Sequence, residues 1–196
     1  RIEGFSNRDT GAVVLKGTTL DPRLGNPPHR VYETPMGMLN AIGLQNPGTD
    51  NVVRAILPAL DFDETRFIAN VSGSTIEEYA EVTRRFDDSP IDAIEINISC
   101  PNVKEGGVAF GNYPEMSARV VAACRAVTKK PLITKLSPNQ TDIKENARLC
   151  IEAGSDGLAV INTVMGMAID VKSRKPVIGN VQGGLSGPAI KPIALL

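Results

Sequence analysis

The 196-residue sequence has no tryptophan, one histidine and only 4% aromatic residues, and its formal net charge is -1. So few rings and so little excess positive charge leave neither the stacking platform nor the basic patch of a nucleic-acid-binding protein. No run approaches the roughly 20 apolar residues that span a bilayer, and residues 1–10 lack the apolar core of a signal peptide. These absences predict a cytoplasmic protein with no nucleic-acid partner and no membrane span.

Cysteine is also scarce. The three cysteines, Cys100, Cys124 and Cys150, are too few and too widely spaced for a disulfide framework or a Cys-x-x-Cys metal site, so we expect free thiols. No group of histidine, cysteine and carboxylate residues has ligand spacing, and we expect no bound metal. The remaining composition, 42% hydrophobic and 22% charged, is typical of one globular domain, which we place at residues 1–196.

Apolar runs alternate with helical patterns along the chain. The predicted strands cover residues 12–16, 67–69, 94–99, 132–135 and 158–162, and the predicted helices cover 51–60, 75–86, 114–128 and 141–154, with Thr141 as the N-cap of the last. Residues 18–48 hold five prolines and four glycines and are predicted as a long loop. A hairpin is expected over 168–171 and 176–178, and residues 183–188 are expected to lead into a helix. Such alternation requires parallel strands.

Two architectures fit this order, a doubly wound sheet and a (β/α)8 barrel. No G-x-G-x-x-G follows the first strand, which removes the main support for a dinucleotide-binding sheet. The five apolar runs each end in a lysine or an asparagine, namely Lys16, Asn70, Asn97, Lys135 and Asn162. A barrel brings such ends together, whereas an open sheet would spread them along an edge. We therefore predict an α/β fold of the TIM (β/α)8 barrel type, incomplete at about five to six βα units because a full barrel takes ~250 residues.

We call Lys16, Asn70, Asn97, Lys135 and Asn162 the strand-end site. Each residue alone could be a solvated charge or part of a turn, but five of them at one position in successive βα units favour a shared ligand. Ammonium groups and carboxamide donors, with no acidic partner expected beside them, would stabilise negative charge. The predicted ligand is therefore planar and anionic, or becomes anionic during the reaction.

Cys100 follows the predicted strand over 94–99 and lies between Ser99 and Pro101. Lysines at the neighbouring strand ends could lower the pKa of its thiol below the usual value of about 8.5. A thiolate there would serve as a base or a nucleophile. Cys124 and Cys150 fall in predicted helices and are expected to be small buried apolar residues. The lone His29 lies in a proline-rich stretch expected at the surface, which makes a Cys–His dyad the weaker alternative.

Several segments resemble class 1 dihydroorotate dehydrogenases, in order and over nearly the whole chain. They are K-G-T-T at 16–19, P-R-L-G-N-P at 22–27, M-L-N-A-I-G-L-Q-N at 38–46, N-I-S-C-P-N-V at 97–103, K-L-S-P-N at 135–139 and I-N-T at 161–163. V-K-E-G-G at 103–107 and G-G-L-S-G-P at 183–188 resemble the NAD-linked heteromeric subclass, 1B. The resemblance implies a TIM barrel and an FMN enzyme of de novo pyrimidine biosynthesis that oxidises dihydroorotate to orotate.

By this resemblance Cys100 is the base that takes the proton from C5 while a hydride leaves C6 for N5 of the flavin. The implied substrate-binding residues are Lys16, Asn40, Ala41, Ile42, Gly43, Leu44, Asn97, Asn102, Asn162 and Thr163. The implied FMN-binding residues are Lys16, Gly17, Asn70, Asn97, Lys135, Ile161 and Gly187. All five residues of the strand-end site are among them.

The resemblance also implies partners. One is a second subunit that carries FAD and a two-iron two-sulfur cluster and passes electrons to NAD, and another is a second catalytic subunit in a homodimeric core. The family's first strand, with its Ala-Ser-Gly stretch, and two late glycine-rich strand ends that hold the FMN phosphate have no counterpart here. We therefore expect a chain truncated at both ends that binds FMN poorly by itself. Two alternatives stay open: a flavin oxidoreductase acting on dihydropyrimidine bases, and a non-catalytic flavin-binding fragment.

Overall fold

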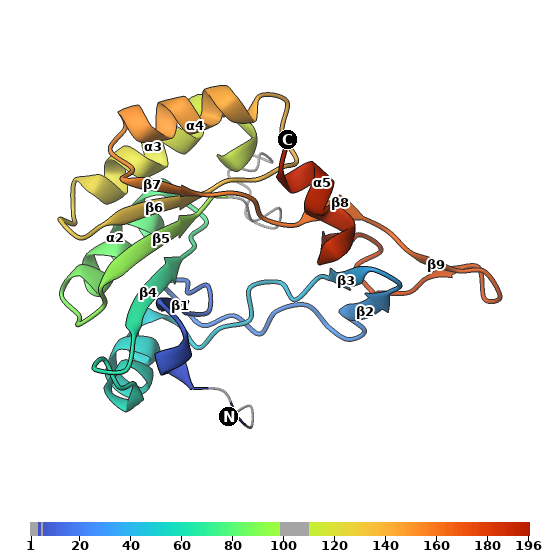
Figure 1. The fold of residues 1–196 in the computed structure, drawn as a ribbon, viewed down its shortest axis with the longest axis horizontal. Helices are drawn as coiled ribbons and strands as arrows, with labels where there is room; N and C mark the ends of the chain where they lie inside the picture. The colour runs from blue at the N-terminus through green and yellow to red at the C-terminus, as the bar shows by residue number, and fades with distance from the viewer. Residues whose placement is uncertain (1–3, 5, 99–109) are drawn as a thin grey trace.

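A computed structural model of the protein describes residues 4, 6–98 and 110–196. Its centre is a parallel sheet of five strands, drawn in Figure 1. The strands are β1 (Ala12–Val14), β4 (Arg66–Val71), β5 (Ala93–Asn97), β6 (Leu132–Lys135) and β7 (Gly157–Ala159). Their spatial order β1-β4-β5-β6-β7 is the order in which they occur along the chain, and every neighbouring pair is parallel. In a doubly wound sheet the spatial order of the strands reverses at a switch point, and no such reversal occurs among these five strands. The prediction of barrel-type winding is therefore confirmed.

Three helices cover one face of this sheet (Figure 1). They are α2 (Ile76–Asp87), α3 (Pro114–Arg125) and α4 (Ile143–Glu152), and α3 packs against both of the others. The Thr75 hydroxyl accepts a hydrogen bond from the Glu78 N–H and caps α2 as predicted. The prediction for α4 is wrong by one residue, because the carboxylate of Asp142 and not Thr141 accepts from the Glu145 N–H.

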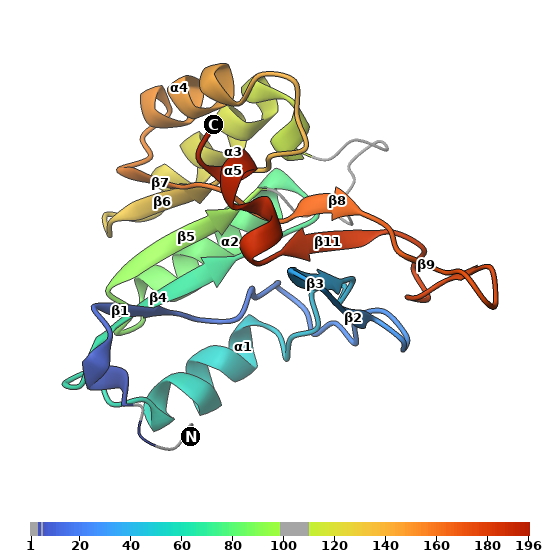
Figure 2. The same cartoon turned by 45° about the vertical axis from the view of Figure 1, so that its right-hand side comes forward.

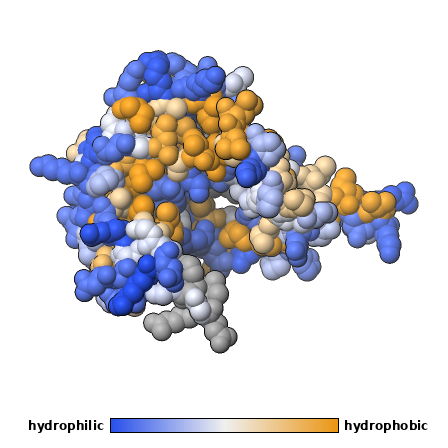
Figure 3. Space-filling model, viewed as in Figure 1, coloured by the Kyte–Doolittle hydropathy of each residue, from blue (hydrophilic) through white to orange (hydrophobic). Residues whose placement is uncertain are grey.

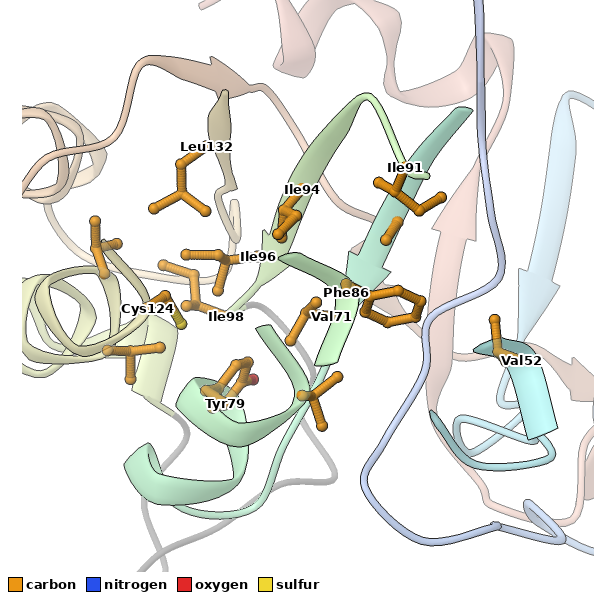
Figure 4. Packing of buried hydrophobic residues seen from close by; sticks show 14 of the residues in the cluster. Val52, Val71, Tyr79, Phe86, Ile91, Ile94, Ile96, Ile98, Cys124 and Leu132 are labelled. Atoms are coloured by element: carbon orange, nitrogen blue, oxygen red, sulfur yellow. The ribbon is translucent and has the colours of Figure 1, made fainter. Parts of the chain in front are cut away.

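The core lies between the sheet and these helices (Figure 4). Ile94 and Ile96 of β5 are fully buried and belong to the same apolar cluster as Tyr79, Phe86 and Cys124. The alternate residues of β5, including Asn97, are also buried, which is the mark of a barrel strand covered on both sides. Hydrophobic packing on the helix side thus fixes which β5 side chains point into the barrel.

A second sheet lies beyond the carboxyl ends of the parallel strands, as Figure 2 shows. It is antiparallel, has the order β2-β3-β11-β8, and consists of β2 (Val31–Thr34), β3 (Gly37–Asn40), β11 (Gly183–Ser186) and β8 (Val164–Gly166). The prediction of one long loop over 18–48 is therefore wrong for the β2–β3 hairpin, and residues 183–186 form a strand before the chain reaches its last helix. The predicted hairpin near 168–178 is present as β9 (Ile169–Asp170) and β10 (Lys175–Pro176).

The remaining elements are short. Residues 49–59 form one helical stretch, made of α1 (Thr49–Asn51), the π-helical η2 (Val52–Ile56) and the 3-10 turn η3 (Leu57–Ala59), close to the predicted helix over 51–60. The others are η1 (Asn7–Asp9), η4 (Phe110–Asn112), η5 (Pro188–Ile190) and α5 (Lys191–Ala194). No helix in the described ranges has the length and apolar character needed to cross a bilayer.

Strands β1 and β7 form the two edges of the described parallel sheet. Beside β7, apolar residues gather on the face shown in Figure 3, and the exposed Val160 and Ile193 contribute to the apolar surface of the molecule. An exposed edge strand presents unpaired backbone N–H and C=O groups, and a closed barrel has no such edges. This arrangement agrees with the prediction of an incomplete barrel.

Candidate active site

The strand-end site lies at one edge of the parallel sheet. Register pairs Asn70 with Glu95, and it pairs Asn97 with Lys135, so each pair points to the same face of the sheet. Lys16 follows β1 where the chain still runs beside β4, since the Thr18 N–H donates to the Asn70 carbonyl at 2.9 Å. This register places Asn70, Asn97 and Lys135 side by side, with Lys16 next along the sheet, as the barrel interpretation requires. The predicted strand over 158–162 is shorter in the structure, because β7 ends at Ala159 and Asn162 follows it. The roles of these residues stay predictions.

Asn97 and Asn162 meet directly across this edge. The Asn162 Nδ2 group donates to Asn97 Oδ1 at 3.3 Å, and the Asn162 N–H donates to the Leu136 carbonyl at 2.9 Å. The end of β5 is held from the helix side as well, because the Tyr79 hydroxyl donates to the Asn97 carbonyl at 2.8 Å. Two carboxamides from strands that are not neighbours are thereby placed beside each other.

A buried carboxylate also belongs to this region, and the expectation of no acidic partner is wrong. Glu95 is 6% exposed and accepts a hydrogen bond from Asn70 Nδ2 at 2.6 Å. The signal was available in the sequence, because Glu95 precedes Asn97 by two residues in a strand and so points to the same face. Because the Asn70 NH2 group is directed at Glu95, the Asn70 oxygen is directed away from it.

The Asn70 oxygen has an unusual environment. Asn70 Oδ1 and the Ser72 hydroxyl are buried and have no hydrogen-bond partner among the described residues. Both lie against Gly17, where a Cβ would come within 2.8 Å of Asn70 Oδ1 and 3.5 Å of Ser72 Oγ. Buried polar atoms are nearly always paired with protein, water or ligand. A polar group from outside the described residues would therefore complete this spot, and the absence of a side chain at Gly17 keeps room beside it.

Two positive charges stand at the same edge. Lys135 is half-buried at the end of β6, and Lys16 is exposed after β1. Within the described residues neither lysine takes part in an ion pair, so both ammonium groups are available to an anionic ligand. The described residues contain no cluster of three or more histidine, cysteine or carboxylate side chains that could hold a metal.

The antiparallel sheet supplies the other predicted substrate residues. Asn40 Nδ2 donates to the Gly184 carbonyl at 3.3 Å, and a Cβ on Gly184 would overlap the side chain of Thr163. Asn40, Ala41 and Gly184 line a hollow of about 420 Å³. The loop Ala41–Leu44 continues from β3 toward the parallel sheet, where a Leu44 methyl group lies 3.5 Å from the position of a Cβ on Gly17. The loop thus links the two sheets.

Not every predicted residue joins the cluster. Gly187 has φ +97° and lies against Gly37 and Met36 of the β2–β3 hairpin, so its described neighbours are not those of the strand-end site. Ile161 lies one residue before Asn162, in the segment that connects β7 to β8. Cys100, the predicted base, and Asn102 lie outside the described residues.

The structure describes the surroundings of the other two cysteines. Cys124 and Cys150 are fully buried, and burial raises the pKa of each thiol to about 12. At pH 8 only about one molecule in 10⁴ would carry a thiolate at either position. This supports the expectation that both are structural.

We therefore expect a Cys100→Ser variant, folded at pH 8, to react negligibly with the thiol reagent DTNB over minutes. After unfolding in guanidinium chloride, Cys124 and Cys150 should react at once, which gives two thiols for residues 1–196. The absorbance of the coloured thiolate released from DTNB measures the number of reactive thiols in the folded and in the unfolded variant. Rapid reaction of the folded variant with two equivalents would contradict the burial of Cys124 and Cys150.

Comparisons with known proteins were made for the whole chain. The family model described as dihydroorotate dehydrogenase matches residues 2–196. The chain is 58% identical over 186 residues to a Pelobacter propionicus protein named dihydroorotate dehydrogenase B (NAD(+)), catalytic subunit, covering 94% of this chain and 61% of that protein. Proteins of the same name from Trichlorobacter lovleyi and Anoxybacillus flavithermus are 59% and 56% identical over 94% of this chain, which spans 61% and 60% of their lengths. The chain thus spans about three fifths of these relatives.

Proposed function

The chain belongs to the dihydroorotate dehydrogenase family, and on that premise we propose that the protein oxidises dihydroorotate to orotate in pyrimidine biosynthesis. The observation that carries the proposal is the strand-end site, in which two lysines and three asparagines from successive βα units meet at one edge. Ammonium and amide groups at that edge suit a planar heterocycle with a carboxylate. The names of the relatives support the same reaction.

The described residues fit FMN as the cofactor. Asn70 Oδ1 and Ser72 Oγ beside Gly17, which have no partner in the described part of the chain, offer hydrogen-bond acceptors to a bound group, and Lys16 and Lys135 offer positive charge. We propose that Lys16, Gly17, Asn70, Asn97, Lys135 and Ile161 hold FMN, with Gly187 as a further residue whose described contacts lie elsewhere. FMN, when bound, would accept a hydride from C6 of dihydroorotate.

The proposed roles of the other residues follow from their chemistry. Cys100 would take the proton from C5 of the substrate, and Asn97, Asn102, Asn162 and Thr163 would hold the ring and its carboxylate together with Lys16. Residues Asn40, Ala41, Ile42, Gly43 and Leu44 would close the site from the antiparallel sheet. Holding a substrate in one orientation can lower the activation free energy by roughly 7–11 kcal/mol in favourable systems.

We further propose partners for the protein, of which the relatives' names support a separate subunit. A protein called the catalytic subunit of an NAD(+)-linked enzyme works with another subunit, and for this chain we propose one that carries FAD and a two-iron two-sulfur cluster. A homodimeric core and a cytoplasmic location stay predictions from the sequence.

Turnover on two substrates tests the proposal. The FMN-loaded full-length protein is expected to oxidise dihydroorotate with a kcat/KM at least about 10²-fold higher than for dihydrouracil, which lacks the carboxylate. Formation of orotate is followed by its absorbance. Equal or greater activity on dihydrouracil would favour the alternative of a dihydropyrimidine oxidoreductase, and absence of activity on both would favour a non-catalytic flavin-binding protein.

A further inference from the structure

Asn139 lies in the loop between β6 and α4, four residues after Lys135, and the proposed function gives it no role. Its side-chain amide makes two hydrogen bonds to the segment that enters β8. Nδ2 donates to the Thr163 carbonyl at 3.0 Å, and Oδ1 accepts from the Met165 N–H at 2.9 Å. The Ser137 hydroxyl accepts from the Asn139 backbone N–H at 3.1 Å and so fixes the residue itself.

This pair of bonds reproduces the pairing of a parallel strand. In a parallel ladder one residue bonds the carbonyl and the N–H of two residues that flank its partner. The Asn139 amide does the same around Val164, at the place where the chain leaves the parallel sheet and begins the antiparallel one. The Asn139 side chain thus makes, at the start of β8, the two backbone hydrogen bonds that a neighbouring parallel strand would make.

The held segment contains two residues proposed to bind substrate. Asn162 contacts Asn97 on one side, and the Thr163 side chain packs against Gly184 on the other. Gly184 in turn accepts from Asn40. A shift of the Thr163 backbone would therefore displace contacts from both sheets at once.

We propose that Asn139 is a positioning residue that holds Asn162 and Thr163 in the geometry needed to bind the substrate, and this rests on the proposed function. It touches neither substrate nor cofactor in this role. Its expected signature is weaker binding of the substrate and product with a smaller effect on FMN, because the clamped atoms belong to Thr163 and Met165.

Gln140 provides a matched control in the same loop. Its amide Nε2 donates to the Ser137 carbonyl at 2.5 Å, and its Oε1 accepts from Asn146 at 2.7 Å. These hydrogen bonds support the loop and α4, and neither of them goes to residues 161–165. Gln140→Leu removes a comparable number of hydrogen bonds from the same loop.

The experiment compares the FMN-loaded full-length protein with its Asn139→Leu, Asn139→Asp and Gln140→Leu variants. Asn139→Leu should raise the Kd for orotate and the KM for dihydroorotate about tenfold, which corresponds to about 1.4 kcal/mol, while kcat and the Kd for FMN change less than threefold. Amide hydrogen exchange at Met165 should accelerate at least tenfold in Asn139→Leu and stay slow in Gln140→Leu. Asn139→Asp keeps the acceptor for Met165 but sets a carboxylate oxygen against the Thr163 carbonyl, so binding should weaken while Met165 stays protected.

Three outcomes would overturn the inference. They are unchanged orotate binding in Asn139→Leu, equal losses in Asn139→Leu and Gln140→Leu at similar melting temperatures, and no change in Met165 exchange. Should Asn139→Leu fail to fold, the isosteric Asn139→Asp decides by its Kd for orotate, and an unchanged Kd would overturn the inference. A wild-type protein that binds no orotate would contradict the proposed function and this inference with it, whereas a wild type that binds and variants that match it would contradict this inference only.

Discussion

Replacing Cys100 by alanine is expected to lower kcat for dihydroorotate oxidation at neutral pH by at least about 10²-fold. Removal of a positioned general base typically costs 10²–10⁴ in rate. The other two cysteines of residues 1–196 are poor substitutes, because Cys124 and Cys150 are buried with a thiol pKa of about 12. The expectation rests on the place of Cys100 in the sequence, three residues after Asn97 of the strand-end site. Steady-state turnover of the FMN-loaded protein measures it.

The control for this variant is Cys150→Ala, which makes the same chemical change at a buried thiol. It should keep kcat within threefold of wild type while lowering the melting temperature slightly, because it leaves a small cavity. Cys100→Ser should regain part of its activity as the pH rises, since a serine hydroxyl is a much weaker acid than a thiol and its deprotonated form becomes populated only at higher pH. Undiminished turnover of Cys100→Ala at neutral pH would remove Cys100 from the mechanism and support a non-catalytic interpretation.

Replacing Lys135 by glutamine is expected to lower kcat by about 10²-fold or more, the usual cost of losing one group that stabilises developing charge. Lys135 ends β6, pairs with Asn97 in register, and has no ion-pair partner among the described residues. Its ammonium group would favour the reduced, negatively charged flavin. The midpoint potential of the bound flavin should therefore become more negative by about 30 mV or more, the shift that a tenfold change in a two-electron equilibrium gives.

Lys129→Gln is the matched control for the charge change. Lys129 is exposed and precedes β6, so it lies at the opposite end of the strand from Lys135. Both variants lose one positive charge, but only Lys135→Gln should alter the potential and the turnover. Equal effects from both would mean that net charge rather than position matters.

The parallel sheet was predictable because its strands are short apolar runs, and most of them are followed by a pattern typical of a helix. The runs at 67–69, 94–99 and 132–135 each correspond to an observed strand, since burial on both faces selects apolar residues there. The β2–β3 hairpin was missed because its exposed residues do not form a clear alternating pattern among five prolines and four glycines. Strand β11 was missed for a related reason, since Gly183 and Gly184 lower strand propensity yet permit close approach to Asn40 and Thr163.

The strand-end site was predictable from position alone, because each residue follows an apolar run. Its contacts were not. The hydrogen bond from Asn70 to Glu95 depends on register between two strands 25 residues apart, which local sequence does not encode. The same holds for Asn139, because its partners Thr163 and Met165 are separated from it along the chain by α4 and β7.

A crystal structure of the FMN-loaded full-length protein with orotate tests the central claim most directly. We expect the flavin and the orotate ring to lie at the carboxyl edge of the parallel sheet, with Lys16, Asn70, Asn97, Lys135 and Asn162 all within hydrogen-bonding distance of one or the other. Ligands bound elsewhere, or fewer than three of these side chains in contact with them, would contradict the account.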